Sequence, residues 1–148
     1  MCGDDASYTQ KGYLDRILHM ELSAFVACFE AAMSVGTVVN NAGKGTSTIL
    51  RYRSGCVTYR RGTSNFSVRL GDLYAAYMNH RGLQVTTRDL KAYKPDVFDS
   101  SARPSGHNCH CTFLFRGLQR MRLAGDLTGR GVSGDPFAVE MFAATKAA

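Results

Sequence analysis

The tract from His107 to Cys111 holds the densest group of side chains able to do chemistry. It reads His-Asn-Cys-His-Cys, four nitrogen or sulfur ligands in five positions. Zinc needs about four ligands in a tetrahedron, and so short a run rarely supplies more than two or three. A distant partner such as Cys28, Cys56 or His80 would be needed, and no Cys-x-x-Cys pair supplies one. We therefore expect a helix start with Cys111 buried as a small apolar residue, no cofactor, and zinc as the less favoured alternative.

A thiolate nucleophile is the second chemistry that this tract suggests. Cys109 lies beside His107 and His110, and a neighbouring imidazole can activate a thiol. Adjacent residues on one helix seldom point at each other, however, and no orienting acid is evident. The carboxylates elsewhere are scattered without the spacing of an acid–base pair. The sequence therefore predicts no catalytic residue and no metal site, and we expect that the chain is not an enzyme.

Positive charge is concentrated between Arg51 and Lys94. Lys and Arg minus Asp and Glu give this stretch a net charge of 9 − 2 = +7. The same count gives 3 − 5 = −2 for residues 1–50 and 6 − 5 = +1 for residues 95–148, and the three values sum to the net charge of +6. A localised basic field attracts polyanions and contributes little to folding. Thirteen of the 18 cations are arginine, whose planar guanidinium binds phosphate bidentately. Nucleic acid is the partner that this pattern predicts.

The second half of the basic stretch has the outline of a helix-turn-helix, over about residues 67–94. Apolar residues recur at helical spacing from about Ser67 to just before Gly82, and Thr86 to Asp89 has the Thr-x-x-Asp form of a helix start. A short link containing glycine joins the two expected helices. In such a unit the second helix presents its first turns to a duplex. This half of the stretch therefore favours duplex DNA.

The first half of the basic stretch predicts a small β-hairpin. Two runs rich in branched and aromatic residues, 48–54 and 56–61, meet at Ser54-Gly55, and alternation gives one face rich in arginine. Tyrosine alternating with arginine suits single strands, so DNA and RNA both remain open and the duplex is only slightly favoured. The residues expected to contact nucleic acid are Arg51, Arg53, Arg60, Arg61, Arg81, Thr86, Thr87, Arg88, Lys91 and Lys94.

The remaining patterns predict the elements that position these residues. We expect a mainly α fold of four to five helices with the small hairpin, in a single domain over residues 1–148. A long first helix follows a capping box at Ser7–Gln10, and a third helix covers about 108–123. Residues 126–134 read as a flexible glycine-rich linker. A C-terminal docking helix should open at Asp135-Pro136.

Two functions compete on these observations. The favoured one is nucleic-acid binding through residues 51–94. The alternative is a structural assembly protein, such as a capsid or nucleoid-coating subunit, that packages nucleic acid non-specifically. It would form a homo-oligomer through its first and last helices, the last carrying Phe137, Met141 and Phe142.

The same sequence features predict where the chain resides. The longest apolar runs fall far short of the roughly 20 residues that span a bilayer, so no membrane partner is expected. The acidic, polar N-terminus does not resemble a secretory signal. Five cysteines at irregular spacings do not indicate a disulfide framework. We therefore expect an intracellular location, in the cytoplasm, nucleoid, nucleus or a virion.

Overall fold

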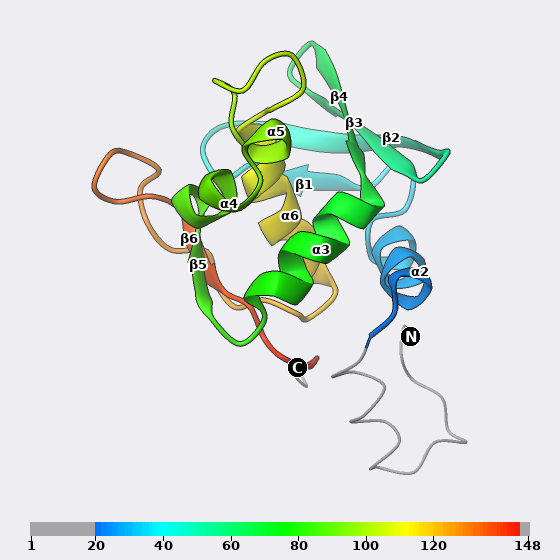
Figure 1. Ribbon diagram of the computed structural model, residues 1–148. Coiled ribbons are helices and arrows are strands. Elements are labelled where there is room, and N and C mark those ends of the chain that lie inside the picture. Colours follow the sequence, from blue (N-terminus) through cyan, green and yellow to red (C-terminus); the bar gives the residue numbers. More distant parts are fainter. Residues whose placement is uncertain (1–19, 146–148) are drawn as a thin grey trace.

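A computed structural model describes residues 20–145, and it shows a mixed α/β protein rather than the mainly α fold that we predicted (Figure 1). The larger sheet is antiparallel, with strands in the order β1 (Val38–Asn40), β2 (Thr46–Arg53), β3 (Cys56–Arg61) and β4 (Ser64–Arg69). A smaller sheet pairs β5 (Gln84–Thr86) with β6 (Ala138–Glu140). The described helices are α2 (Leu22–Ala32), α3 (Leu70–His80), α4 (Thr87–Tyr93), α5 (Pro95–Phe98) and α6 (Cys109–Arg120).

The predicted hairpin is confirmed as β2 and β3. Ser54 and Gly55 both have positive φ, 53° and 77°, which is the pattern of a type I′ turn whose twist matches that of the flanking strands. The hairpin is part of a larger sheet because β1 pairs with β2 on one side and β4 pairs with β3 on the other. The β4 segment was predicted as the start of a helix. It is a strand because Phe66 and Val68 face inward with period two.

The predicted helix-turn-helix is wrong. Its two helices exist as α3 and α4, and the predicted cap of α4 is a capping box between Thr86 and Asp89. The link between them, however, contains strand β5, which pairs with the distant β6. Helix α4 packs on α5 and α6 instead of forming a helical pair with α3. The third predicted helix is confirmed as α6, and α2 confirms part of the first, whose capping box lies outside the described residues.

The predicted C-terminal docking helix is a strand. Residues 138–140 form β6, and Thr128 also bridges to Ala138, so the glycine-rich segment turns back on the strand that follows it. Met141 is fully buried in the core of its own chain. The hydroxyl of Tyr77 on α3 donates to the carbonyl of Phe142 over 2.6 Å. The described end of the chain therefore contains a strand docked on its own fold, and not the docking helix that suggested an assembly protein.

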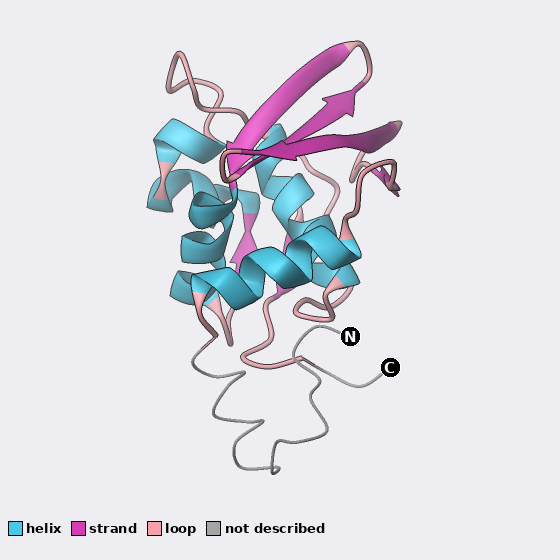
Figure 2. Cartoon of the chain, turned by 90° about the vertical axis from the view of Figure 1, so that its right-hand side faces the viewer, coloured by secondary structure: helices cyan, strands magenta, loops and turns pink. Residues whose placement is uncertain are grey.

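The helices cover one face of the larger sheet and leave the other open (Figure 2). Inward side chains of the strands, including Ile49, Val57 and Tyr59, are fully or almost fully buried. The ring of Phe113 on α6 stacks on Tyr59 with centroids 3.9 Å apart, and Phe29 on α2 packs against Phe113 at 5.9 Å. This aromatic contact joins sheet and helices into one core.

Gly117 marks the closest approach of α6 to α2. A Cβ atom at this position would lie 2.4 Å from a ring carbon of the fully buried Phe29, so the core would have to shift to admit it. We expect Gly117→Ala to lower the free energy of unfolding by about 1–3 kcal/mol through overpacking, measured by urea denaturation. Gly71→Ala on α3 is the matched control, because nothing lies within 4 Å of its added Cβ. The free energy of unfolding of Gly71→Ala should be unchanged or rise by up to about 1 kcal/mol. An equal change in the two variants would contradict the close packing of Gly117 against Phe29.

Candidate nucleic-acid interface

The open face of the larger sheet carries four exposed arginines, Arg51, Arg53, Arg60 and Arg69, which we call the arginine face. The strand register places them in rows: Arg53, Cys56 and Arg69 in one, Arg51, Thr58 and Ser67 in the next, and Thr48, Arg60 and Asn65 in the third. Neighbouring strands lie about 4.8 Å apart and alternate residues of one strand about 7 Å apart. The four cations therefore share one surface a few strands wide.

A β-bulge gives the arginines of β2 their orientation. The pairing of β2 with β3 shifts between Ile49 and Arg51, which is the only irregularity in that ladder. Simple alternation along β2 would place Ile49 and Arg51 on the same side of the sheet. The extra residue Leu50 lets Ile49 face the core while Arg51 and Arg53 face solvent. The predicted arginine-rich face is thus present, although it is built differently.

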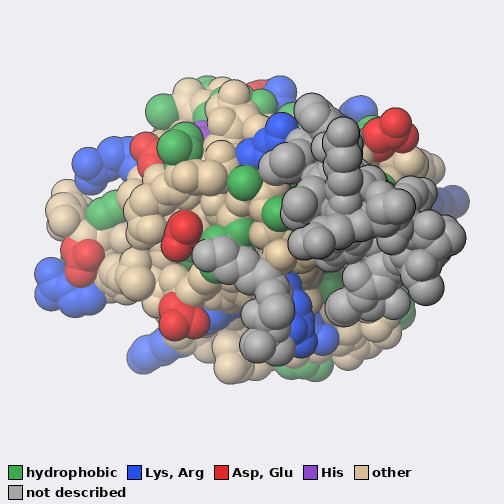
Figure 3. Space-filling view, turned by 90° about the horizontal axis from the view of Figure 1, so that it is seen from below, with side chains coloured by type: hydrophobic (Ala, Val, Ile, Leu, Met, Phe, Trp, Pro, Cys, Tyr) green, Lys and Arg blue, Asp and Glu red, His purple; other side chains and the backbone are tan. Residues whose placement is uncertain are grey.

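No carboxylate among the described residues forms an ion pair with the arginine face. Residues 31–71 contain Lys44, Arg61 and the four arginines of the face but no Asp or Glu, so this segment carries 6 − 0 = +6, as much as the whole chain. Within residues 20–145, the ion pairs are Lys94–Asp96 at 3.9 Å and Arg130–Asp135 at 3.0 Å, both outside the sheet. The side of the molecule away from the sheet differs, since acidic and basic side chains are mixed where described residues are visible (Figure 3).

Neutral groups orient the polar side chains of this face. The Nε–H of Arg60 donates to the side-chain oxygen of Asn65, its cross-strand partner, over 3.2 Å. The hydroxyls of Thr58 and Ser67 lie 2.6 Å apart in the neighbouring row. An amide acceptor leaves the full positive charge of Arg60 in place. The face is therefore ordered by hydrogen bonds and stays cationic.

Aromatic rings lie on the opposite side of the sheet. The hydroxyl of Tyr52 donates to the carbonyl of Met33 over 2.5 Å, and Tyr59 and Phe66 pack toward α6 and the segment before it. The alternation of tyrosine and arginine, which suggested stacking on single-stranded bases, puts the two residue types on opposite faces. Among residues 20–145, the arginine face has cations and hydroxyls but no stacking ring.

The helical part of the predicted site lies elsewhere in the molecule. Helix α4 lies beside the small sheet, on the side that the helices occupy (Figure 1). The Oγ1 of Thr86 accepts from the backbone N–H of Asp89 at 3.1 Å, and Lys94 pairs with Asp96. These groups are engaged locally. The structure therefore brings three predicted residues together on the sheet, Arg51, Arg53 and Arg60, and Arg61 follows Arg60 at the end of β3. It separates them from the other predicted residues, which are Arg81, Thr86, Thr87, Arg88, Lys91 and Lys94.

Two cations of the sheet segment were missing from the prediction. Arg69 was assigned to a helix, yet it lies across Cys56 from Arg53 on the arginine face. Lys44 lies in the β1–β2 loop, which Asn41 holds through a 3.0 Å hydrogen bond to the Lys44 carbonyl. The signal that finds both is the run from 31 to 71 without an acidic residue. This run contains all four strands of the larger sheet, whereas the positively charged stretch 51–94 omits β1 and most of β2.

The His107–Cys111 tract forms a buried hydrogen-bond cluster at the start of α6. The Tyr59 hydroxyl lies 2.8 Å from Nδ1 of His110 and donates to the Cys109 sulfur at 3.1 Å. Burial raises the pKa of the Cys109 thiol, and burial together with the charge of His107 lowers the pKa of His110 to about 4. Both groups are therefore neutral near pH 7, which does not favour a reactive thiolate.

The same tract behaves as a structural element in the described chain. Cys111 is fully buried, as predicted, and Cys56, Cys109 and Cys111 are free thiols. Among residues 20–145, no group of three or more His, Cys, Asp or Glu side chains could hold a metal ion.

Comparison with known protein families, curated proteins and solved structures finds no match to this chain. No helix in the described part of the chain has the length and apolar character needed to cross a bilayer.

Proposed function

We propose that this protein binds the phosphate backbone of a duplex nucleic acid through the arginine face. The observation that carries the proposal is an open sheet surface with four exposed arginines, in a segment of 41 positions, 31–71, without a carboxylate. Cationic side chains that neutralise phosphates release condensed counterions, which supplies affinity without reading sequence. Hydroxyls and amides between the arginines add hydrogen-bond partners for phosphate oxygens.

The absence of a stacking ring on the arginine face favours a duplex over a single strand. Proteins that bind single strands without sequence preference combine a basic groove with aromatic side chains on which bases stack. Here Tyr52, Tyr59 and Phe66 belong to the inner face of the sheet. A duplex keeps its bases stacked internally and presents phosphates, which is what this surface can contact. The preference for a duplex, first suggested by a helix-turn-helix, now rests on the sheet.

The proposal predicts steeply salt-dependent binding. The four contacts of the arginine face alone give a slope of log K against log salt of about −3.6, so affinity should fall at least about 10²-fold between 50 and 200 mM salt. Fluorescence anisotropy with labelled duplex DNA, duplex RNA and the matching single strands measures it. Arg51→Gln/Arg53→Gln should weaken duplex binding by about tenfold and reduce the slope by about 2.

The control for this experiment removes two positive charges from a part of the protein outside the arginine face. Arg88→Gln/Arg130→Gln replaces two exposed arginines outside the large sheet. It should bind like the parent chain. No retention of any duplex at 50 mM salt, or equal losses in the two double variants, would refute the proposal.

A further inference from the structure

A second basic surface lies at the end of the sheet, where β1 approaches α6. Three neighbouring hollows lie there and share lining residues, and we call them together the basic trench. The first is lined by Lys44, Arg60 and Arg61, and it shares Arg61 and Asn41 with the second. The second shares Val39, Asn40 and Arg116 with the third, which reaches Arg120 and has a volume of about 340 Å³. The trench thus contains five cations and no Asp or Glu.

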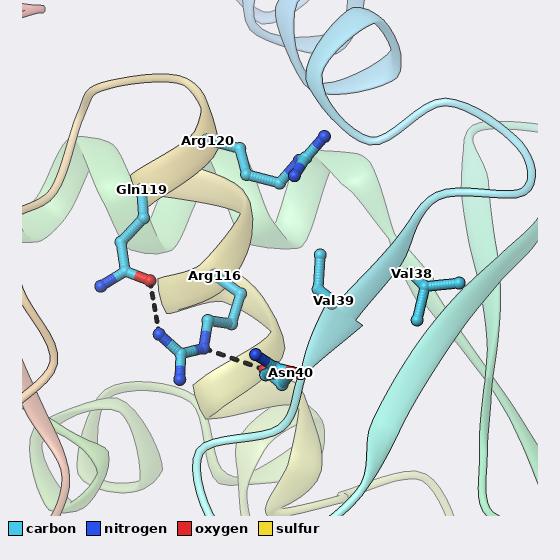
Figure 4. A pocket seen from close by; sticks show the side chains of 6 residues that line it. All are labelled: Val38, Val39, Asn40, Arg116, Gln119 and Arg120. Carbon is cyan, nitrogen blue, oxygen red and sulfur yellow. Dashed lines mark hydrogen bonds between the residues drawn. The ribbon is translucent and has the colours of Figure 1, made fainter. Parts of the chain in front are cut away.

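Neutral acceptors hold the two arginines of α6 in place, and Figure 4 shows the two hydrogen bonds of Arg116. The Nε–H of Arg116 donates to the carbonyl of Asn40 over 3.0 Å, and its Nη1 donates to Gln119 over 2.9 Å. The Nε–H of Arg120 donates to the carbonyl of Ala32, the last residue of α2, over 2.7 Å. These bonds fix each guanidinium on the rim of the groove without reducing its charge.

Much of the hydrogen-bonding capacity of these arginines is unused. A guanidinium has five N–H donors. Arg116 uses two of them and Arg120 one, which leaves 5 − 2 = 3 and 5 − 1 = 4 donors without an acceptor among the described residues. The pair is spaced i, i+4 on one helix, an arrangement in which like charges repel by about 0.2–0.5 kcal/mol. Both side chains line the same groove, so an anion bound there would lower this repulsion and accept hydrogen bonds from the unused donors.

We infer that the groove between β1 and α6 is a phosphate-binding site for Arg116 and Arg120. Its ligand is a phosphodiester of the same nucleic acid whose neighbouring phosphates contact the arginine face, so the inference rests on the proposed function. The route from one surface to the other passes Arg60, which belongs to both, and then Arg61 and Lys44. The backbone of the ligand therefore continues past the end of the sheet and onto α6.

The first test uses the duplex assay at 100 mM salt. Arg116→Gln/Arg120→Gln should lose about tenfold in affinity and reduce the salt slope by about 2. Arg88→Gln/Arg130→Gln is again the control with equal charge. Unchanged binding by the trench variant, while Arg51→Gln/Arg53→Gln is weakened, overturns the inference and leaves the proposed function standing. A parent chain that retains no duplex overturns both.

The second test titrates the unaltered chain, and single variants serve only to assign its signals. The Nε–H groups of Arg116 and Arg120 are hydrogen-bonded, so their ¹⁵N–¹H signals should be protected from exchange and visible by NMR. Loss of one signal in each single variant, Arg116→Gln and Arg120→Gln, assigns them. Titration with inorganic pyrophosphate should shift both signals saturably. Signals that stay in place through the titration overturn the inference.

Discussion

Tyr59→Ala should lower the free energy of unfolding by about 3–5 kcal/mol, the range for removing a fully buried aromatic side chain. Tyr59 has no exposed surface, stacks on Phe113 at 3.9 Å and contacts Phe66 at 5.8 Å, so truncation leaves a cavity where the sheet meets α6. It also removes the hydroxyl that lies between His110 and Cys109. Urea denaturation monitored by circular dichroism gives the loss.

Two further variants separate packing from hydrogen bonding. Tyr59→Phe keeps the ring and should cost about 1–3 kcal/mol, since it leaves the buried Nδ1 of His110 without its partner. Tyr93→Ala removes a tyrosine that is 38% exposed and touches His80 edge-on, and it should cost about 1 kcal/mol or less. A Tyr59→Ala variant as stable as Tyr93→Ala would show that the aromatic contact does not join sheet and helices.

Acid should destabilise this protein through His110. Its pKa is about 4 in the folded chain, because burial and His107 disfavour the charged form, against about 6.5 when unfolded. The unfolded chain therefore binds more protons below pH 6.5. The free energy of unfolding is therefore unaffected by the protonation of His110 above pH 6.5 and decreases as the pH falls from about 6.5 to 4. The total loss is about 3 kcal/mol, since each unit of pKa difference corresponds to about 1.4 kcal/mol. Urea midpoints measured across this range reveal the loss.

The control must remove the contribution of carboxylates, which also titrate toward pH 4. His110→Gln should be less stable than the parent at pH 7, but the difference between the two should narrow as the pH falls from 6.5 to 4. His107→Gln keeps the buried imidazole of His110, so this variant should still lose most of the same stability between pH 6.5 and 4. Parallel pH profiles for the parent and His110→Gln would show that His110 does not titrate with unfolding.

Local signals in the sequence predicted those parts of the fold that depend on local contacts. The β2–β3 hairpin was predicted because Ser54-Gly55 suits a tight turn, and the start of α4 because Thr86 and Asp89 cap each other. Strands β5 and β6 were missed because each is three residues long and they pair across more than fifty positions of the chain. Such short strands have no periodic pattern, and only the partner defines them.

In the candidate site as well, local features were predicted and features that depend on distant contacts were not. The charge pattern predicted Arg51, Arg53 and Arg60, and the structure places them on one surface. That Ile49 and Arg51 face opposite sides of the sheet depends on the bulge at Leu50, which the alternation of residue types does not reveal. Arg116 and Arg120 could not be predicted, since their position beside β1 depends on a contact between residues 76 apart in sequence, Asn40 and Arg116.

The missing acidic residues of the sheet segment also limit how copies of this protein can approach one another. Two molecules placed with their arginine faces together would oppose four cations to four, at a separation well inside the screening length of about 8 Å at physiological salt. Close packing through this face requires a layer of negative charge between the molecules. Under the proposed function, a polyanion bound to the arginine face would supply this layer and would permit two copies to pack through that face.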